Sequence, residues 1–122
     1  QYDCKDKDAN ELVGASIDAQ IMVASADSLG LCIFGRSVTN THTDFLTAAI
    51  NDAHGIELDD DFYARLGRET LVLEDKFNLA AGFTEADDEL PAFFYEESLP
   101  PSNKAARFHS DEVNETARAI RV

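Results

Sequence analysis

A carboxylate and a thiol stand five positions apart across a glycine in Asp27-Ser28-Leu29-Gly30-Leu31-Cys32. On an unbroken helix, residues five apart point about 140° away from each other and cannot serve one ligand. Glycine readily adopts the left-handed conformation that ends helices, so a helix stopping at Gly30 would turn both side chains toward one site. A carboxylate in the last turn also faces the negative end of the helix dipole, which costs roughly 0.3–1 kcal/mol. Asp27 is therefore a candidate for a role other than helix stability.

A simpler interpretation of the same residues is an ordinary helix C-terminus with a buried free cysteine, and local chemistry alone favours it. A cubane iron–sulfur cluster generally needs four thiolates, so Cys32 alone cannot hold one. If Cys32 is a cluster ligand, the other three ligands must lie outside this chain. Cys4 is a poor second ligand, and its polar setting differs so much from that of Cys32 that we do not expect a disulfide between them.

The other acidic, histidine and hydroxyl side chains show no convincing metal-binding or catalytic pattern. The acidic runs Asp59-Asp60-Asp61 and Asp87-Asp88-Glu89 suggest a hard cation, but acidic residues also complement helix N-termini, and neither run has calcium-loop spacing. His42, His54 and His109 are isolated, so no zinc-type pair exists. No nucleophile elbow or phosphate-binding loop surrounds the serines and threonines.

Composition narrows the class of protein. The 122 residues suit one domain, and the net charge of −14 argues against nucleic acid or an anionic membrane as a partner. No transmembrane run or export signal is present, and reduced thiols indicate the cytoplasm. The chain begins with Gln1 and its only methionine is Met22, so we expect it to be a piece of a longer protein.

The apolar pattern predicts two helices in the first half of the chain. Residues 10–28 are apolar nearly all round, which predicts a helix buried on several sides. Gly30 should end this helix, followed by a short apolar segment over residues 31–34 and a loop over residues 35–41. A second helix should begin near Thr41 or Thr43 and stop at Gly55. Its expected buried stripe is Phe45, Leu46, Ala49, Ile50 and Ala53.

The second half predicts two further helices around an irregular segment. A third helix is expected over residues 60–81, ended by Gly82, with the buried stripe Phe62, Leu66, Thr70, Leu73 and Phe77. Thr84 and Asp87 resemble a capping box, and prolines keep residues 83–109 largely irregular. Ser110 should cap a last helix over residues 111–121. The fold class is all-α, with about four helices, a flexible edge over residues 1–9 and a helical domain over residues 10–122.

Four blocks of sequence resemble the tungsten- and molybdenum-dependent aldehyde ferredoxin oxidoreductases. Asp27–Cys32 corresponds to the family's D-x-x-G-L-C motif, and Phe77–Thr84 is similar to its F-N-x-R-x-G-F-T segment, with Ala80 in place of arginine. Asp87–Pro91 matches D-D-x-L-P, and residues 93–99 resemble R-F-x-E-E-x-L with phenylalanine in place of arginine. The end of the chain, residues 112–122, lacks the pattern common in relatives.

The resemblance implies a specific role for the first block in a full-length enzyme. Asp27 would accept hydrogen bonds from pterin nitrogens, Leu31 would make backbone contacts to the pterin, and Cys32 would be the last of four [4Fe-4S] ligands. The other three would come from a C-x-x-C-x-x-x-C group far upstream. The implied centre is a tungsten or molybdenum bis-pterin that oxidises an aldehyde-type substrate and passes electrons to ferredoxin or a similar acceptor.

The implied partners follow from this picture. They are the rest of the same polypeptide and the electron acceptor, without nucleic acid or membrane, and a homodimer is one arrangement that the family allows. The fragment alone is expected to be inactive and to hold no cofactor. The competing class is a non-enzymatic acidic helical module that binds a basic partner. A domain taken from a large enzyme should expose the apolar face around residues 29–34, whereas a self-sufficient module should not.

Overall fold

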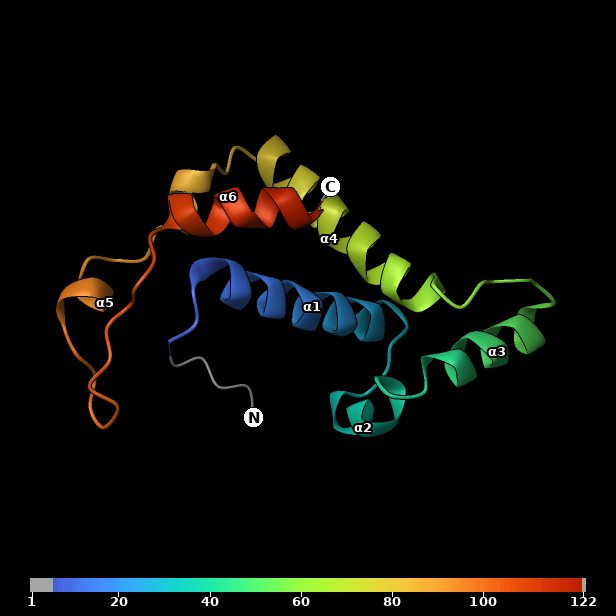
Figure 1. The fold of residues 1–122 in the computed structure, drawn as a ribbon. Helices are drawn as coiled ribbons and strands as arrows, with labels where there is room; N and C mark the ends of the chain where they lie inside the picture. Colours follow the sequence, from blue (N-terminus) through green and yellow to red (C-terminus); the bar gives the residue numbers. More distant parts are fainter. Residues whose placement is uncertain (1–5, 122) are drawn as a thin grey trace. The chain divides into compact units, whose positions relative to one another are not determined.

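The computed structural model describes residues 6–121, and its regular elements are helical, as the all-α prediction required (Figure 1). Cys4 lies outside the described residues. Within them, the backbone pairing characteristic of strands is limited to one isolated bridge between Leu99 and Lys104. The elements are α1 (Ala9–Ser28), η1 (Ile33–Gly35), α2 (Arg36–Thr39), α3 (Thr43–His54), α4 (Phe62–Ala80), η2 (Glu85–Asp88), α5 (Phe93–Glu96) and α6 (Ser110–Arg121).

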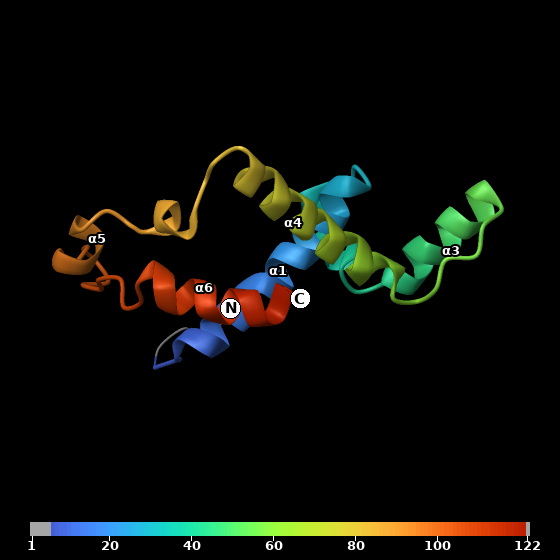
Figure 2. The ribbon, with the colours of Figure 1, turned by 90° about the horizontal axis from the view of Figure 1, so that it is seen from above.

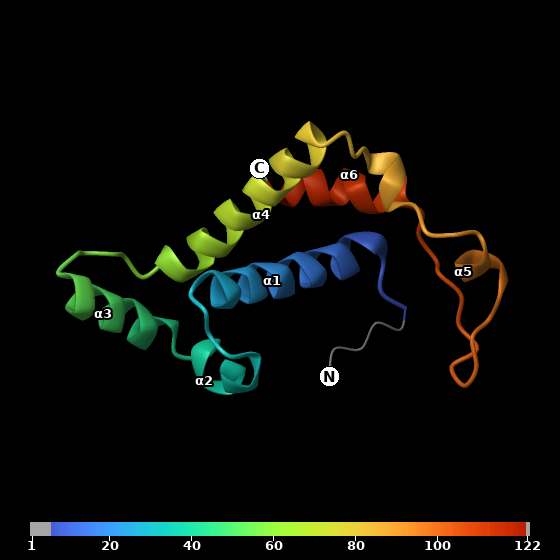
Figure 3. The same cartoon turned by 180° about the vertical axis from the view of Figure 1, so that it is seen from behind.

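The chain divides into two compact units, one formed by Gln1–Ile17 with Asn78–Val122 and the other by Asp18–Phe77. In the first unit, α6 lies beside the N-terminal half of α1 (Figure 3). The Thr116 hydroxyl donates to the Asn10 side-chain oxygen at 2.6 Å, which joins the two helices. Val13 and Ile17 on α1 and Ala117 on α6 are the buried apolar residues of this unit among those that the structure describes.

The short helix η2 is bonded to α6 and begins with the predicted capping box. The Thr84 N–H donates to the Asp87 carboxylate at 2.7 Å, and the reciprocal bond is also present. Asn114 donates to Asp88 at 3.2 Å, and Arg118 forms an ion pair with Glu85. These polar contacts fix η2 on α6 although the segment that follows is largely irregular, as predicted.

The start of α6 is held by Glu89, which lies 21 residues back along the chain from Ser110. One Glu89 carboxylate oxygen accepts from the Ser110 N–H at 2.8 Å, and the other lies 2.8 Å from His109 Nδ1. The His109 ring stacks on Tyr95, with centroids 4.2 Å apart. Hydrogen bonds from Ser110, and then from His109 and Tyr95, lower the pKa of Glu89 to about 2, and the same carboxylate raises the pKa of His109.

This contact should stabilise the first unit most strongly between pH 4.5 and 6.5. The pKa of Glu89 falls from 4.5 to about 2 on folding, so its contribution is complete above pH 4.5 and is lost as the pH falls toward 2. The pKa of His109 rises above 6.5, so its contribution is complete below that pH and is lost as the pH rises through the folded value. The urea concentration at the midpoint of unfolding should therefore decrease both below pH 4.5 and above pH 6.5.

The matched pair Glu89→Gln and Glu97→Gln separates this contact from the general effect of charge. Glu97 is exposed and lies at the C-terminus of α5, so its substitution removes the same charge without breaking the bonds to Ser110 and His109. The profile should flatten in Glu89→Gln and keep its shape in Glu97→Gln. Parallel profiles in the two variants would remove the Glu89 contact as the cause.

In the second unit, α4 crosses the C-terminal half of α1 at very short range (Figure 2). A Cβ atom placed on Gly67 would lie 2.1 Å from the Ile21 carbonyl oxygen, so only glycine allows this approach. The buried Ser25 hydroxyl lies 2.6 Å from the Tyr63 carbonyl oxygen and 2.9 Å from that of Ile21. Ile21, Ser25, Tyr63 and Gly67 are all buried.

Several burial predictions were wrong, although the helices themselves were predicted within a few residues. Leu73 and Phe77, placed on the buried stripe of α4, are 65% and 72% exposed, and Phe45 on α3 is 65% exposed. The helix over residues 9–28 is buried along the line of Val13, Ile17, Ile21 and Ser25 and not on several sides, since Val23 is 45% exposed. A helical period marks one face but does not say which part of that face another element covers.

Candidate cofactor-binding site

The helix ends at Gly30 as predicted, through a Schellman motif. Gly30 has a φ of 67°, the left-handed value that glycine adopts without strain. Its N–H donates to the Asp27 carbonyl oxygen at 3.0 Å, and the Leu31 N–H donates to that of Ala26 at 2.8 Å. The motif turns the chain back over α1, so residues that follow Gly30 can face residues that precede it.

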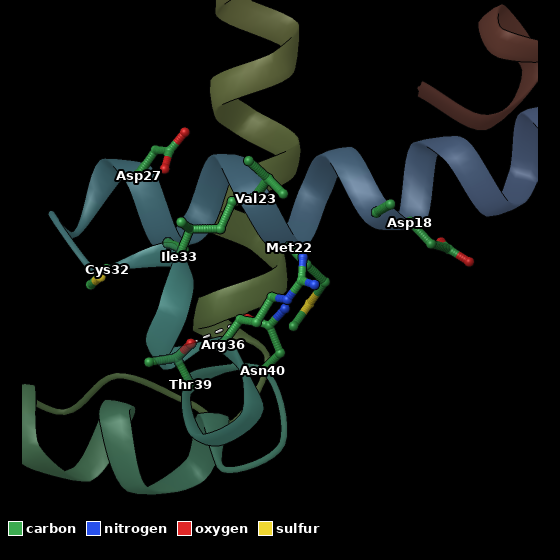
Figure 4. A pocket seen from close by; sticks show the side chains of 11 residues that line it. Asp18, Met22, Val23, Asp27, Cys32, Ile33, Arg36, Thr39 and Asn40 are labelled. Atoms are coloured by element: carbon green, nitrogen blue, oxygen red, sulfur yellow. Dashed lines mark hydrogen bonds between the residues drawn. The ribbon is translucent and has the colours of Figure 1, made fainter. Parts of the chain in front are cut away.

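Asp27 and Cys32 both line one pocket beside this turn, although their side chains point in different directions (Figure 4). The pocket has a volume of about 340 Å³ and lies within the second unit, between α1 and residues 32–40. Its apolar lining comes from Ala19, Met22, Val23, Ala26 and Ile33. Its polar lining comes from Asp18, Asp27, Cys32, Arg36, Thr39 and Asn40. A small-molecule site usually combines an apolar lining with a few polar groups.

The three residues expected from the D-x-x-G-L-C block differ in their settings. Cys32 is a free cysteine and is exposed, which contradicts the buried cysteine of the simpler interpretation. Asp27 is also exposed, and its carboxylate forms no ion pair within the described part of the chain. Leu31 does not line the pocket, and its N–H is committed to the helix cap. A backbone contact from Leu31 to a ligand would therefore have to use its carbonyl oxygen.

Arg36, Thr39 and Asn40 line the pocket, within residues 35–41, which were expected to form a loop. That prediction was wrong, because Arg36–Thr39 forms helix α2. The Thr39 and Thr41 hydroxyls bond back to the carbonyl oxygens of Gly35 and Ser37, so these polar side chains support the turn. The available signal was the spacing of Arg36 and Asn40, which lie four residues apart and share one face of a helical turn.

A buried tyrosine hydroxyl lies on the α4 side of the same unit. Tyr63 is 2% exposed, and its hydroxyl has no hydrogen-bond partner among the described residues. Burial, and then the negative charge of Asp27, raise the pKa of Tyr63. The hydroxyl therefore stays protonated at neutral pH and is a donor without an acceptor in this part of the structure. Such groups are uncommon in native structures, and functional sites are one place where they occur.

The other acidic and histidine candidates make local bonds. Both carboxylate oxygens of Asp59 lie 3.0 Å from Arg65, and this hydrogen-bonded partner lowers the pKa of Asp59. Asp87 belongs to the capping box and Glu89 binds His109. Over residues 6–121, no three His, Cys, Asp or Glu side chains are grouped to hold a metal ion.

The thiol and the carboxylate at the pocket could form part of a cofactor site but not a whole one. A single thiol can supply one of the four ligands of a cubane cluster, and a carboxylate can accept hydrogen bonds from the amine-type nitrogens of a heterocycle. Both groups are exposed on the same pocket, so a ligand can reach them. No helix in the described part of the chain has the length and apolar character needed to cross a membrane.

Known proteins resemble this chain over most of its length. The family model "Aldehyde ferredoxin oxidoreductase, domains 2 & 3" matches residues 3–119. The tungsten-containing aldehyde ferredoxin oxidoreductase of Pyrococcus horikoshii is 34% identical over 93 residues, covering 75% of this chain and 15% of that protein. No solved structure matches the chain. With nearly its whole length matched by the family model, the chain belongs to the aldehyde ferredoxin oxidoreductase family.

Proposed function

We propose that the chain contributes one wall of the cofactor site of an aldehyde-oxidising enzyme with a tungsten or molybdenum bis-pterin centre. The observation that carries this proposal is the placement of Asp27 and Cys32 on one pocket, within the segment matched by the family. When bound, the metal–pterin centre would oxidise the aldehyde and a [4Fe-4S] cluster would carry electrons to ferredoxin.

Each residue has a defined task in this proposal. The Asp27 carboxylate accepts hydrogen bonds from pterin nitrogens, and such charge-assisted bonds are roughly twice as strong as neutral ones. Its position at the C-terminal end of α1 costs helix stability, so a binding role explains why a carboxylate stands there. Cys32, as a thiolate, binds one iron of the cluster. Because both line the same pocket, they hold pterin and cluster close together.

The residues beside the pocket favour a role within a larger enzyme over the alternative of a non-enzymatic acidic module. Ile33 and Phe34, directly after Cys32, are 55% and 94% exposed. Adjoining apolar side chains of this kind suit an interface with another part of the same enzyme. The chain spans about 15% of the length of the relative it matches. A cytoplasmic location and a homodimer remain predictions.

Asp27→Asn in the full-length enzyme tests the proposed pterin contact. Loss of the charge should lower pterin and metal content per chain by roughly tenfold, the scale of a lost hydrogen bond to a charged group. Helix α1 should remain folded, because the substitution removes an unfavourable charge from its negative end. Pterin is measured by fluorescence after oxidative release, metal by mass spectrometry and helix content by circular dichroism.

Asp52→Asn is the matched control, since Asp52 is an exposed carboxylate of the same unit on α3 that does not line the pocket. Asp52→Asn should keep the pterin and metal content of the unmodified enzyme. Equal pterin content in Asp27→Asn and Asp52→Asn would exclude Asp27 as a cofactor contact.

A further inference from the structure

Residues 90–108 extend away from η2 and α6 and return to the start of α6, and we call this segment the strap (Figure 1). Glu89 lies directly before the strap, and His109 and Ser110 lie directly after it. The Glu89 carboxylate joins the two ends. One oxygen lies 2.8 Å from His109 Nδ1, and the other accepts from the Ser110 N–H at 2.8 Å. Loops whose ends lie close together are frequently functional, and lids are among them.

The two limbs of the strap contact each other. The Ala106 N–H donates to the Phe94 carbonyl oxygen at 2.7 Å, and the Tyr95 hydroxyl donates to that of Phe108 at 3.3 Å. The Tyr95 ring also stacks on His109, with centroids 4.2 Å apart. These contacts need the limbs side by side, which is the arrangement that Glu89 maintains at their base.

The attachment of η2 to α6 does not depend on the base of the strap. Asn114 on α6 donates to Asp88 at 3.2 Å, and Arg118 forms an ion pair with Glu85. Both contacts join residues before Glu89 to residues after the strap, so they can persist when the strap opens. Opening of the strap is therefore a local event, of the kind that mobile segments undergo without unfolding of the rest.

His109 is the member of the base whose charge changes near neutral pH. The pKa of Glu89 is lowered to about 2, so this carboxylate stays ionised. Burial, and then Glu89, raise the pKa of Tyr95 above 10, so the ring that faces His109 from α5 stays neutral. Protonated His109 makes a charge-assisted bond to Glu89, roughly twice as strong as the bond that neutral His109 can make.

The charges that face His109 all favour its protonated form. The hydrogen bond to Glu89 is the main cause that raises the pKa of His109, and the negative charges of Glu89, Asp111 and Glu112 act in the same direction. Arg107, two residues earlier, lies over the ring of the phenylalanine that follows it. The contribution of His109 to closure is therefore complete below pH 6.5 and is lost as the pH rises through its folded pKa.

We propose that protonated His109 holds the strap closed and that its deprotonation lets the strap open as a local unit. In the closed strap Phe94 and Tyr95 are only partly exposed, and opening would expose both. The strap thus presents two aromatic side chains at high pH and withholds them at low pH. This device does not involve Asp27 or Cys32.

Hydrogen exchange in the full-length enzyme, followed by mass spectrometry of peptides, measures the opening of the strap. Dividing each exchange rate by the intrinsic rate at the same pH gives the opening constant. For peptides of the strap, this constant should rise about two- to fivefold between about pH 5.5 and about pH 8.5, the scale of an exposed ion pair in the interval where histidine loses its charge. For peptides of α6, it should stay the same.

Three variants assign the effect to the charge of His109. In His109→Gln the strap should be as open at both pH values as the unmodified strap is at high pH. His109→Arg should keep it closed at both, because arginine keeps the charge and can stack on Tyr95. His54→Gln is the matched control, since His54 is an exposed histidine at the end of α3, outside the strap. It should show the pH dependence of the unmodified enzyme.

Equal opening constants at the two pH values in the unmodified enzyme would overturn the proposal. An equal rise with pH in His109→Gln and His54→Gln would also overturn it, as would a His109→Arg strap that opens at high pH. A rise with pH shared by α6 would show that the whole unit loosens, and would contradict the local opening of the strap.

Discussion

Replacing Gly67 by alanine is expected to destabilise the second unit by about 2–4 kcal/mol, the range for severe overpacking combined with loss of a buried hydrogen bond. The added Cβ would lie 2.1 Å from the Ile21 carbonyl oxygen, 2.4 Å from the Ser25 hydroxyl and 2.9 Å from the Ile21 carbonyl carbon. Two of these three atoms belong to the α1 backbone and cannot move aside by rotation of a side chain. Helices α1 and α4 would have to separate.

The intrinsic preference for helix acts in the opposite direction and is too small to compensate. Alanine is favoured over glycine inside a helix by about 1 kcal/mol. Separation of the helices would break the 2.6 Å bond between the buried Ser25 hydroxyl and the Tyr63 carbonyl oxygen, and would open the packing around Ile21 and Tyr63. The steric clash and the lost packing therefore outweigh the helix preference, and Gly67→Ala should lower the free energy of unfolding.

Urea unfolding of the 122-residue chain, followed by circular dichroism, measures the effect, with hydrogen exchange in α4 to locate it. Gly14→Ala is the matched control, because Gly14 lies on α1 and a Cβ atom added there would meet nothing within 4 Å. That substitution should stabilise the chain by about 0.5–1 kcal/mol. If Gly67→Ala also proved stabilising, the close crossing of α1 and α4 would be wrong.

Local sequence signals predicted the helix ends well. Gly30, Gly55 and Gly82 all take positive φ, at 67°, 64° and 95°, and each lies where a helix was expected to stop. The reciprocal Thr84 and Asp87 bonds were likewise predictable from a spacing of three. These features depend on a few adjacent residues, which is why the sequence alone was sufficient.

Contacts between distant residues could not be predicted in the same way. Gly67 lies inside a regular helical pattern, and only the structure shows that Ile21 and Ser25 require its missing side chain. Thr47 is 3% exposed, whereas Phe45, two residues earlier and far more apolar, is 65% exposed. Burial is decided by the element that covers a face, and the apolar period carries no information about that element.

The candidate site likewise contains features that the sequence predicts and features that it does not. The turn at Gly30, beside which Asp27 and Cys32 line one pocket, was predictable from a single glycine, whereas helix α2 and its pocket residues were missed. A polar segment rich in serine, threonine and asparagine resembles a loop, and its helix is short. The hydroxyl bonds of Thr39 and Thr41 to preceding carbonyl oxygens explain why these residues support helix α2 here.

Cys32→Ser in the full-length enzyme is expected to disrupt the [4Fe-4S] cluster and to lower its iron content by about a quarter or more. A cubane cluster has four irons, each held to the protein by one thiolate, so the corner without its ligand is the first to be lost. Serine has nearly the shape of cysteine, but its hard hydroxyl oxygen is a poor substitute for the soft thiolate that iron–sulfur clusters select. The described residues around the exposed Cys32 offer no assembled group of His, Cys, Asp or Glu side chains that could replace it.

Iron and acid-labile sulfide per chain, with the electron paramagnetic resonance spectrum of the reduced enzyme, measure the change. Cys4→Ser is the matched control, since Cys4 corresponds to nothing in the family pattern and its loss should leave iron and spectrum unchanged. Asp27→Asn supplies the complementary case, in which pterin falls while the cluster persists. Loss of pterin alone in Asp27→Asn and loss of iron in Cys32→Ser would show that the residues on the two sides of Gly30 bind different cofactors. A Cys32→Ser spectrum identical to that of the unmodified enzyme would exclude Cys32 from the cluster ligands, and with it the proposed link between pterin and cluster at this turn.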